Sequence, residues 1–246
     1  MKAVGILPAR WASTRLPGKV LVKIAGKPML ERVWLRVRAS KELADVIIAC
    51  DELHVLKAAE AFGAKAVLTR KDHPSGSDRV AEVAAATDAD IIVNIQADEP
   101  LIEPLLIDEL VRSLKDDKGC VLATPIKRIS TAEEFLNPNV VKVVIDKNHC
   151  ALYFSRSSIP FKRDGEADVR KYFKHLGIYA YRREFLFDFC RWPKSFLEQE
   201  ECLEQLRVLE AGHRIKTVET VMETIGVDTP EDVLRVETYM KAHGLQ

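Results

Sequence analysis

Three cations lie within ten residues of one another, in a loop that follows the first apolar segment of the chain. They are Arg10, Arg15 and Lys19, with Ala12 and Gly18 among them. Such a loop can wrap a triphosphate, because three positive charges and the backbone N–H groups oppose about four negative charges. The alternative is a solvated basic loop. The P-loop and dinucleotide GxGxxG spacings are both absent here, so neither general nucleotide motif applies.

Two acidic residues follow another apolar run, at 91–95. Asp98 and Glu99 enter a turn that Pro100 stops. Asp98 is a candidate magnesium ligand, because Mg²⁺ takes one or two carboxylates together with phosphate oxygens and water. Alternatively, Asp98 caps the turn. Asp228 is a second candidate, which we expect after a short strand, although an Asp or Thr before Pro-Glu-Asp is also an ordinary helix start.

A polar turn at 69–79 leads into a predicted helix. Its serines, glycine and N-terminal amides suit a nucleobase edge or an anion. A capped helix start explains the serines equally well.

Short β-branched runs alternate with amphipathic segments in the first half of the chain, which predicts a mostly parallel sheet with crossover helices. The expected strands are residues 2–8, 45–50, 65–69 and 89–96. The expected helices are residues 28–39, 52–62 and 76–87. Ligands bind at the carboxyl ends of the strands in such a sheet, so the turns described above are where we expect a site.

The second half of the chain is less regular. We expect strands at 119–127, 140–145 and 173–181, helices at 104–115, 199–211 and 230–242, and a polar loop at 163–168. There is no Ser/Gly linker, internal repeat or low-complexity tract. We therefore expect one domain over 1–246, with two halves at 1–118 and 119–246.

The composition excludes several classes of protein. The chain has 246 residues, of which 47% are hydrophobic, with 37 basic and 37 acidic residues. This balance argues against disorder and against a nucleic-acid partner. No apolar run approaches the ~18 residues of a membrane span, so we expect a soluble, cytoplasmic protein without membrane insertion. The five scattered cysteines include no CxxC pair, which predicts buried thiols instead of a disulfide framework or zinc knuckle.

Several blocks of the sequence together closely resemble the CMP-Kdo synthetases, the 3-deoxy-D-manno-octulosonate cytidylyltransferases. The match runs in order through essentially the whole chain. The Tyr-Phe-Ser-Arg run at 153–156 and the His-Leu-Gly-Ile-Tyr run at 175–179 are the most particular to that family. The blocks are residues 7–10, 13–19, 26–29, 73–79, 94–100, 137–144, 151–160, 174–179, 203–207 and 226–232.

The resemblance implies an α/β, Rossmann-like nucleotidyltransferase fold, with a mostly parallel sheet flanked by helices and a smaller inserted dimerisation element. It implies a transferase that joins CTP to Kdo, giving CMP-Kdo and diphosphate for lipopolysaccharide biosynthesis. It also implies Mg²⁺ as cofactor and a homodimer, with contacts from the 145–180 region. The first half would bind the nucleotide, and the second half would bind the sugar and form the dimer.

The resemblance also implies roles for individual residues. Arg10 and Lys19 would hold the CTP phosphates, and Arg15 would lie close to the same phosphates. Arg10, Lys19 and Asp98 would act in catalysis. Asp98 and Asp228 would bind the magnesium. The full nucleotide-binding set would be Pro8, Ala9, Arg10, Arg15, Lys19, Arg70, Ser75 and Gly76. The sugar pocket would contain Gln96, Arg156, His175 and Glu204.

Other interpretations stay open at this point. His175 is either a sugar contact or a half-buried structural histidine, and the sequence nominates no general base. One alternative is a cytidylyltransferase for 8-amino-Kdo or a sialic acid, because a single polar group in the pocket can change which sugar acid is bound. A glycosyltransferase that uses a nucleotide sugar also pairs a Rossmann-like half with acidic metal ligands. A regulator that only binds CTP is the third alternative, and the complete set of charged residues argues against it.

Overall fold

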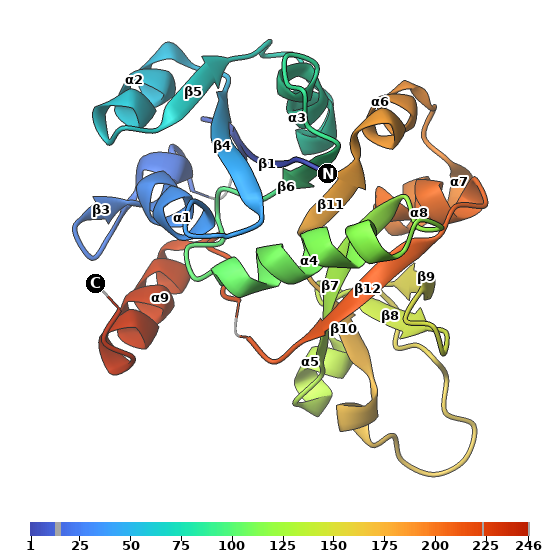
Figure 1. Cartoon of the computed structure of the whole chain (residues 1–246). Coiled ribbons are helices and arrows are strands. Elements are labelled where there is room, and N and C mark those ends of the chain that lie inside the picture. Colours follow the sequence, from blue (N-terminus) through green and yellow to red (C-terminus); the bar gives the residue numbers. More distant parts are fainter. Residues whose placement is uncertain (13–15, 223, 246) are drawn as a thin grey trace. The chain divides into compact units, whose positions relative to one another are not determined.

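The computed structural model describes residues 1–12, 16–222 and 224–245. The chain groups into two compact units, and Figure 1 labels their elements. The first unit contains Met1–Asp108 and Glu223–Gln246, and the second contains Glu109–Met222. This grouping differs from the halves 1–118 and 119–246, because the C-terminal segment returns to the first unit.

The first unit is built on a parallel sheet in the order β5-β4-β1-β6. The strands are β1 (Ala3–Ala9), β4 (Leu43–Cys50), β5 (Lys65–Leu68) and β6 (Ile91–Asn94). Every residue of β1 and β6 is buried, as expected for central strands of a parallel sheet covered on both faces. The four predicted strands of the first half are therefore confirmed. A small hairpin adds β2 (Lys23–Ile24) and β3 (Lys27–Pro28).

Helices follow the strands of the first unit as predicted. They are α1 (Met29–Val37), α2 (Leu53–Ala61), α3 (Gly76–Ala84) and α9 (Pro230–Ala242), with a short 3-10 turn, η1 (Lys19–Leu21). Helix α4 (Pro104–Asp116) carries the chain into the second unit. Helix α9 has the predicted bounds, because Thr229 caps its start and a proline opens it.

The C-terminal helix α9 belongs to the first unit because it shares an apolar core with it. Val236 and Met240 of α9 pack in one cluster with Ile24, Met29 and Leu101. The short strand that we expected before Asp228 is wrong, since residues 224–228 form no strand. A single backbone hydrogen bond, from the Val227 N–H to the Asp98 carbonyl at 2.9 Å, ties this segment to the turn after β6 instead.

The second unit is a mixed sheet centred on β7 (Leu122–Arg128). β10 (Phe173–His175) and β11 (Tyr179–Arg182) pair with β7 antiparallel, and β12 (Ile215–Thr220) pairs with it parallel. β8 (Lys142–Ile145) and β9 (Ala151–Ser155) continue the sheet from β10. The strand predicted at 173–181 is thus two strands, because the backbone turns tightly where the Ile178 N–H donates to the Leu176 carbonyl at 2.8 Å.

The helices of the second unit are shorter. They are α5 (Ala132–Leu136), α6 (Arg183–Arg191), α7 (Phe196–Glu201) and α8 (Gln205–Glu210), with a 3-10 turn, η2 (Val169–Lys171). The single helix predicted at 199–211 is wrong, because Cys202 adopts a left-handed conformation with φ 52° and separates α7 from α8. None of the helices in the described parts of the chain is long and apolar enough to cross a bilayer.

Candidate functional site

A polar cleft of about 350 Å³ lies in the first unit, at the carboxyl ends of β1 and β6. This is where ligands bind in open parallel sheets. Segments after both strands, η1, the start of α3 and Asp228, two residues before α9, all contribute to it. Its lining residues are Pro8, Arg10, Ala12, Lys19, Val20, Gly76, Gln96, Ala97, Asp98 and Asp228.

One ammonium group joins two carboxylates in this cleft. Lys19 Nζ donates to Asp98 Oδ2 at 2.6 Å, to Asp228 Oδ1 at 2.9 Å and to the Val227 carbonyl at 3.2 Å. Burial lowers the pKa of Lys19, but Asp98 and then Asp228 outweigh it, so the pKa is raised and the group is charged. The structure therefore brings together three residues that the sequence placed far apart.

Arg10 extends toward the cleft from the end of β1. Its Nη2 atom is buried and has no hydrogen-bond partner among the residues that the structure describes. A buried guanidinium nitrogen without an acceptor is costly, because a charged donor loses its water without compensation. An anionic ligand in the cleft would supply the missing acceptor.

The loop between β1 and η1 is shaped by a glycine and a tryptophan. Gly18 has φ +65°, and a Cβ there would lie 2.5 Å from the ring of Trp11, so a larger residue would be strained and would displace that ring. The backbone at Trp11 is held in turn, because its main-chain N–H donates to Asp51 Oδ1 at 2.9 Å. These contacts place Lys19 at the start of η1. The predicted phosphate contact Arg15 lies outside the described residues.

The polar turn at 69–79 is a capped helix start in the structure. Ser75 Oγ donates to Asp78 Oδ2 at 2.7 Å and accepts from the Asp78 N–H at 3.2 Å, so the capping interpretation of this serine is confirmed. Gly76 lines the cleft, whereas the Arg70 side chain is 70% exposed and pairs with Glu82 at 3.6 Å. Nucleobase or ribose contacts of Arg70, Ser75 and Gly76 stay a prediction.

The predicted sugar-binding residues are distributed over both units. Gln96 lines the cleft of the first unit, and Arg156, His175 and Glu204 belong to the second. Arg156 donates from Nε to the Glu201 carbonyl at 2.8 Å and from Nη1 to the Pro138 carbonyl at 3.1 Å, so it joins the end of α7 to the loop after α5.

His175 is part of a polar row in the second unit. Its Nε2 lies 2.9 Å from Thr124 Oγ1, and that hydroxyl also lies 2.8 Å from the Ile178 carbonyl. A hydroxyl has one proton, so if Thr124 donates it to the carbonyl, His175 must carry its proton on Nε2. Burial lowers the pKa of His175 to about 3, so the ring is neutral. Tyr179 lies next to it, and burial, Tyr181 and Glu204 raise the pKa of Tyr179.

Comparison with known proteins decides the family. The model of the cytidylyltransferase family matches residues 4–216. A 3-deoxy-manno-octulosonate cytidylyltransferase from Solibacter usitatus is 52% identical, covering 100% of this chain and 97% of its own length. A 3-deoxy-manno-octulosonate cytidylyltransferase from Geotalea daltonii is 48% identical, covering 99% of this chain and 100% of its own length. The chain belongs to the 3-deoxy-manno-octulosonate cytidylyltransferase family.

A solved structure agrees with this membership and with the predicted fold. A CMP:2-keto-3-deoxy-manno-octonic acid synthetase complexed with CTP is 45% identical, with a TM-score of 0.92, and covers 99% of this chain and 100% of that one. A cytidylyltransferase from Leptospira borgpetersenii, at 18% identity and a TM-score of 0.66, shares the fold alone. The family and the α/β nucleotidyltransferase fold that the sequence predicted are both confirmed.

Two ionisable residues that interact electrostatically with residues of this cleft were not predicted. Glu99 has a buried Oε2 without a hydrogen-bond partner among the described residues, and burial, with Asp98 and Asp228, raises its pKa to about 8. Its place in the turn with Asp98 was the only signal in the sequence. Arg79 is 1% exposed and donates to Thr69 Oγ1 at 2.5 Å and to the Arg70 carbonyl at 3.1 Å. It therefore fixes the turn before α3, a role that no local pattern indicates.

Proposed function

We propose that the chain transfers the cytidylyl group of CTP to 3-deoxy-D-manno-octulosonate, releasing diphosphate and giving CMP-Kdo for lipopolysaccharide biosynthesis. The observation that carries this proposal is the cleft in which Lys19 joins Asp98 and Asp228, together with the buried Arg10 nitrogen that has no partner among the described residues. Relatives at 48–52% identity bear the name of this activity, and the similar synthetase was solved with CTP.

In this reaction, the anomeric 2-hydroxyl of the sugar attacks the α-phosphorus of CTP in line with the departing diphosphate. Such transfers depend on positioning and on stabilising charge at the phosphate oxygens. The Arg10 guanidinium would donate from Nη2 to a triphosphate oxygen, which also satisfies its buried nitrogen. Lys19 would contribute a second positive charge, which its raised pKa maintains at neutral pH.

The donor set of the cleft fits a magnesium ion. Asp98 and Asp228 each present a carboxylate oxygen within hydrogen-bond distance of one nitrogen, and Mg²⁺ prefers such a pair of carboxylates with phosphate and water. We propose that these two residues hold the ion, which would screen the triphosphate and polarise the α-phosphoryl group when bound. Lys19 would then be released from the carboxylates to pair with phosphate.

For the sugar acid, we propose contacts from Gln96 in the first unit and from Arg156, His175 and Glu204 in the second. Arg156 supplies the positive charge that a sugar carboxylate requires. The neutral His175 ring and Glu204 offer hydrogen bonds suited to hydroxyl groups.

The test is diphosphate release by the purified chain with CTP, Mg²⁺ and Kdo, with 8-amino-Kdo and N-acetylneuraminate in parallel. We expect release with Kdo alone. Release with another acid only would change the proposed substrate but leave the proposed reaction type unchanged. CTP binding without release in any arm would contradict the proposal and favour a regulator. A glycosyltransferase would instead consume CMP-Kdo without releasing diphosphate.

We also propose a homodimer formed through the second unit. β9 ends its sheet, so its outer backbone groups are available for a partner, and Leu152 on it is 61% exposed. Phe161, in the same predicted contact region, is 86% exposed. Light scattering should give twice the chain mass of 27.7 kDa, and Leu152→Asp should lower it. A monomer for the unaltered chain would contradict the dimer.

A further inference from the structure

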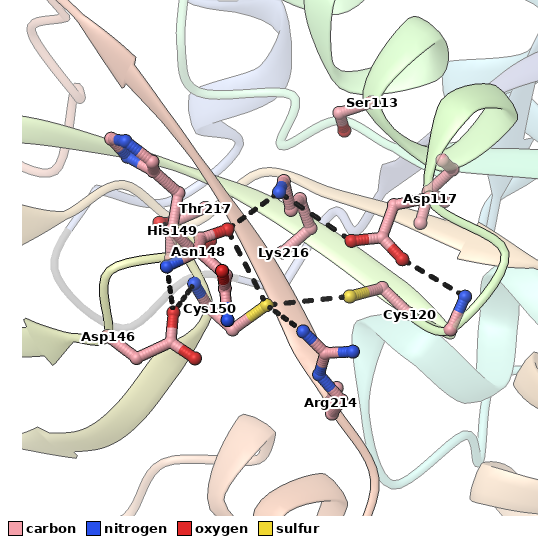
Figure 2. A network of polar contacts seen from close by, with 12 residues as sticks. Ser113, Asp117, Cys120, Asp146, Asn148, His149, Cys150, Arg214, Lys216 and Thr217 are labelled. Carbon is pink, nitrogen blue, oxygen red and sulfur yellow. Dashed lines mark hydrogen bonds and ion pairs between the residues drawn. The ribbon is translucent and has the colours of Figure 1, made fainter.

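Two buried thiols of the second unit lie side by side. Figure 2 shows the Sγ atoms of Cys120 and Cys150 facing each other, 3.7 Å apart. Cys120 lies before β7 and Cys150 before β9, so a bond between them would join two segments that are distant in sequence. Buried thiols were predicted, which is correct for this pair and for Cys50, but wrong for Cys202, which is exposed, and for Cys190, which is half-buried.

The two thiols have different neighbours. Arg214 Nη2 donates to Cys150 Sγ at 3.2 Å, and a neighbouring cation favours the thiolate, which is the nucleophilic form of cysteine. Burial, Cys150 and then Asp117 raise the pKa of Cys120 to about 12, which keeps that thiol protonated. The pair therefore consists of a thiol beside a positive charge and a protonated partner within contact distance.

The pair lies just beneath the surface of its unit. Cys120 is 0% exposed and Cys150 is 3% exposed. Residues close to the two cysteines in sequence are exposed, and so is the arginine that contacts Cys150. These residues are Gly119, Asn148, His149 and Arg214. The buried pair therefore lies between surface segments of its unit.

The charges around the pair favour oxidation over metal binding. Asp117, Cys120 and Cys150 each offer a ligand atom, and these atoms all lie within 4.8 Å of one another. However, Lys216 Nζ lies 3.6 Å from Asp117 Oδ2, and Arg214 contacts Cys150, as Figure 2 shows. Two cations beside the group oppose the entry of a divalent cation and stabilise a thiolate instead.

We propose that Cys120 and Cys150 are a modification site, a dithiol that hydrogen peroxide converts into a reversible intramolecular disulfide. The Cys150 thiolate attacks one peroxide oxygen, which breaks the O–O bond and gives a sulfenic acid, with the leaving hydroxide taking up a proton as water. Cys120 sulfur then attacks Cys150 sulfur and expels the hydroxyl group, which leaves as water with the Cys120 proton. In total, two thiols are oxidised and one peroxide is reduced to two waters.

The first test counts thiols. The native full-length chain is treated with dilute hydrogen peroxide, quenched, denatured and titrated. We expect loss of two of the five thiols, recovery of both after dithiothreitol, and a proteolytic map in which the peptides carrying Cys120 and Cys150 are joined. Cys120→Ser and Cys150→Ser should each abolish the joined peptide, whereas the matched variant Cys202→Ser should retain it.

The second test addresses the role of Arg214, which is exposed and so is replaceable without loss of the core. Arg214→Gln should slow disulfide formation about tenfold at neutral pH, because the variant removes the cation that contacts Cys150 Sγ. The rate should recover at higher pH. Arg214→Lys, which keeps the charge, should retain most of the rate.

Three results would overturn the proposal. One is oxidation of Cys202 while the pair stays reduced, since exposure alone would then govern reactivity. Another is the absence of any joined peptide. The third is binding of one equivalent of Zn²⁺ to the metal-free chain that Cys120→Ser abolishes and Asp98→Asn does not affect, because the group would then be a metal site.

Discussion

At the scale of single residues, the cleft depends on one lysine that balances two carboxylates. Replacing Lys19 by methionine removes the ammonium but keeps the length of the side chain. A charge-assisted contact to phosphate contributes about 1.5–3 kcal/mol, so kcat/KM for CTP should fall roughly 10- to 150-fold. Lys23→Met is the matched control, because Lys23 is exposed in β2. Unchanged CTP kinetics in Lys19→Met would contradict its phosphate role.

The two carboxylates carry a separate prediction about magnesium. Asp98→Asn and Asp228→Asn should each raise the Mg²⁺ concentration for half-maximal diphosphate release by about tenfold or more, since an amide is a weaker ligand than a carboxylate. Chelation should abolish activity of the unaltered chain, and added Mg²⁺ should restore it. Asp88→Asn, at an exposed aspartate that pairs with Lys2, should leave the titration unchanged. Normal magnesium dependence in either cleft variant would exclude that residue as a ligand.

The sequence predicted the residues that line the cleft better than the residues that hold them in place. Arg10, Lys19 and Asp98 follow strands, and strand ends in a parallel sheet meet at one edge, so their proximity follows from local patterns. Asp228 was also a candidate from its own segment, but only the family resemblance placed it in one site with Asp98, because no spacing rule relates the two. Arg79 was missed because its burial depends on acceptors in the preceding turn, which only the folded chain brings together.

At the scale of elements, helices and strands were predicted correctly where the sequence marks their ends with capping or helix-breaking residues. The bounds of α9 were predicted because Thr229, a proline and two acids mark its start. The strand β12 was not predicted, since its run of Lys, Thr and Glu reads as exposed, yet it pairs in parallel with the central strand β7. Whether such a segment forms a strand depends on pairing partners that are distant in sequence, and no local pattern contains them.

The start of α9 also carries a prediction at this scale. Thr229 Oγ1 accepts from the Asp232 N–H at 3.4 Å, whereas the Asp228 N–H donates to Asp232 Oδ2 at 3.1 Å. Thr229→Ala should therefore lower the free energy of unfolding by about 1 kcal/mol and leave diphosphate release intact, because Asp232 still holds Asp228. Thr229→Ser should retain the stability. Urea unfolding measures both variants, and a loss of magnesium dependence in Thr229→Ala would contradict this division of roles.

At the scale of the whole molecule, the chain returns to its first unit after completing the second. The first unit therefore contains both ends of the chain, and its cleft includes Asp228 from the returning segment. Local patterns predict the elements of each unit, but the grouping depends on the apolar cluster that Val236 and Met240 form with residues near the N-terminus. For this reason, the C-terminal segment belongs to the first unit, whereas the sequence suggested that it belongs to the second half.

The stability of the whole chain should decrease on acidification, in part through His175. Burial lowers the pKa of this histidine to about 3 in the folded state, against about 6.5 in an unfolded chain. The unfolded state therefore binds the extra proton first, so the contribution of His175 is fully present above pH 6.5 and is lost as the pH falls toward 3. His175→Gln should have a shallower loss of unfolding free energy across this interval than the unaltered chain. His243→Gln, at an exposed histidine, should follow the unaltered chain. Urea unfolding at several pH values measures the slopes, and equal slopes for His175→Gln and the unaltered chain would show that His175 takes up its proton as readily when folded.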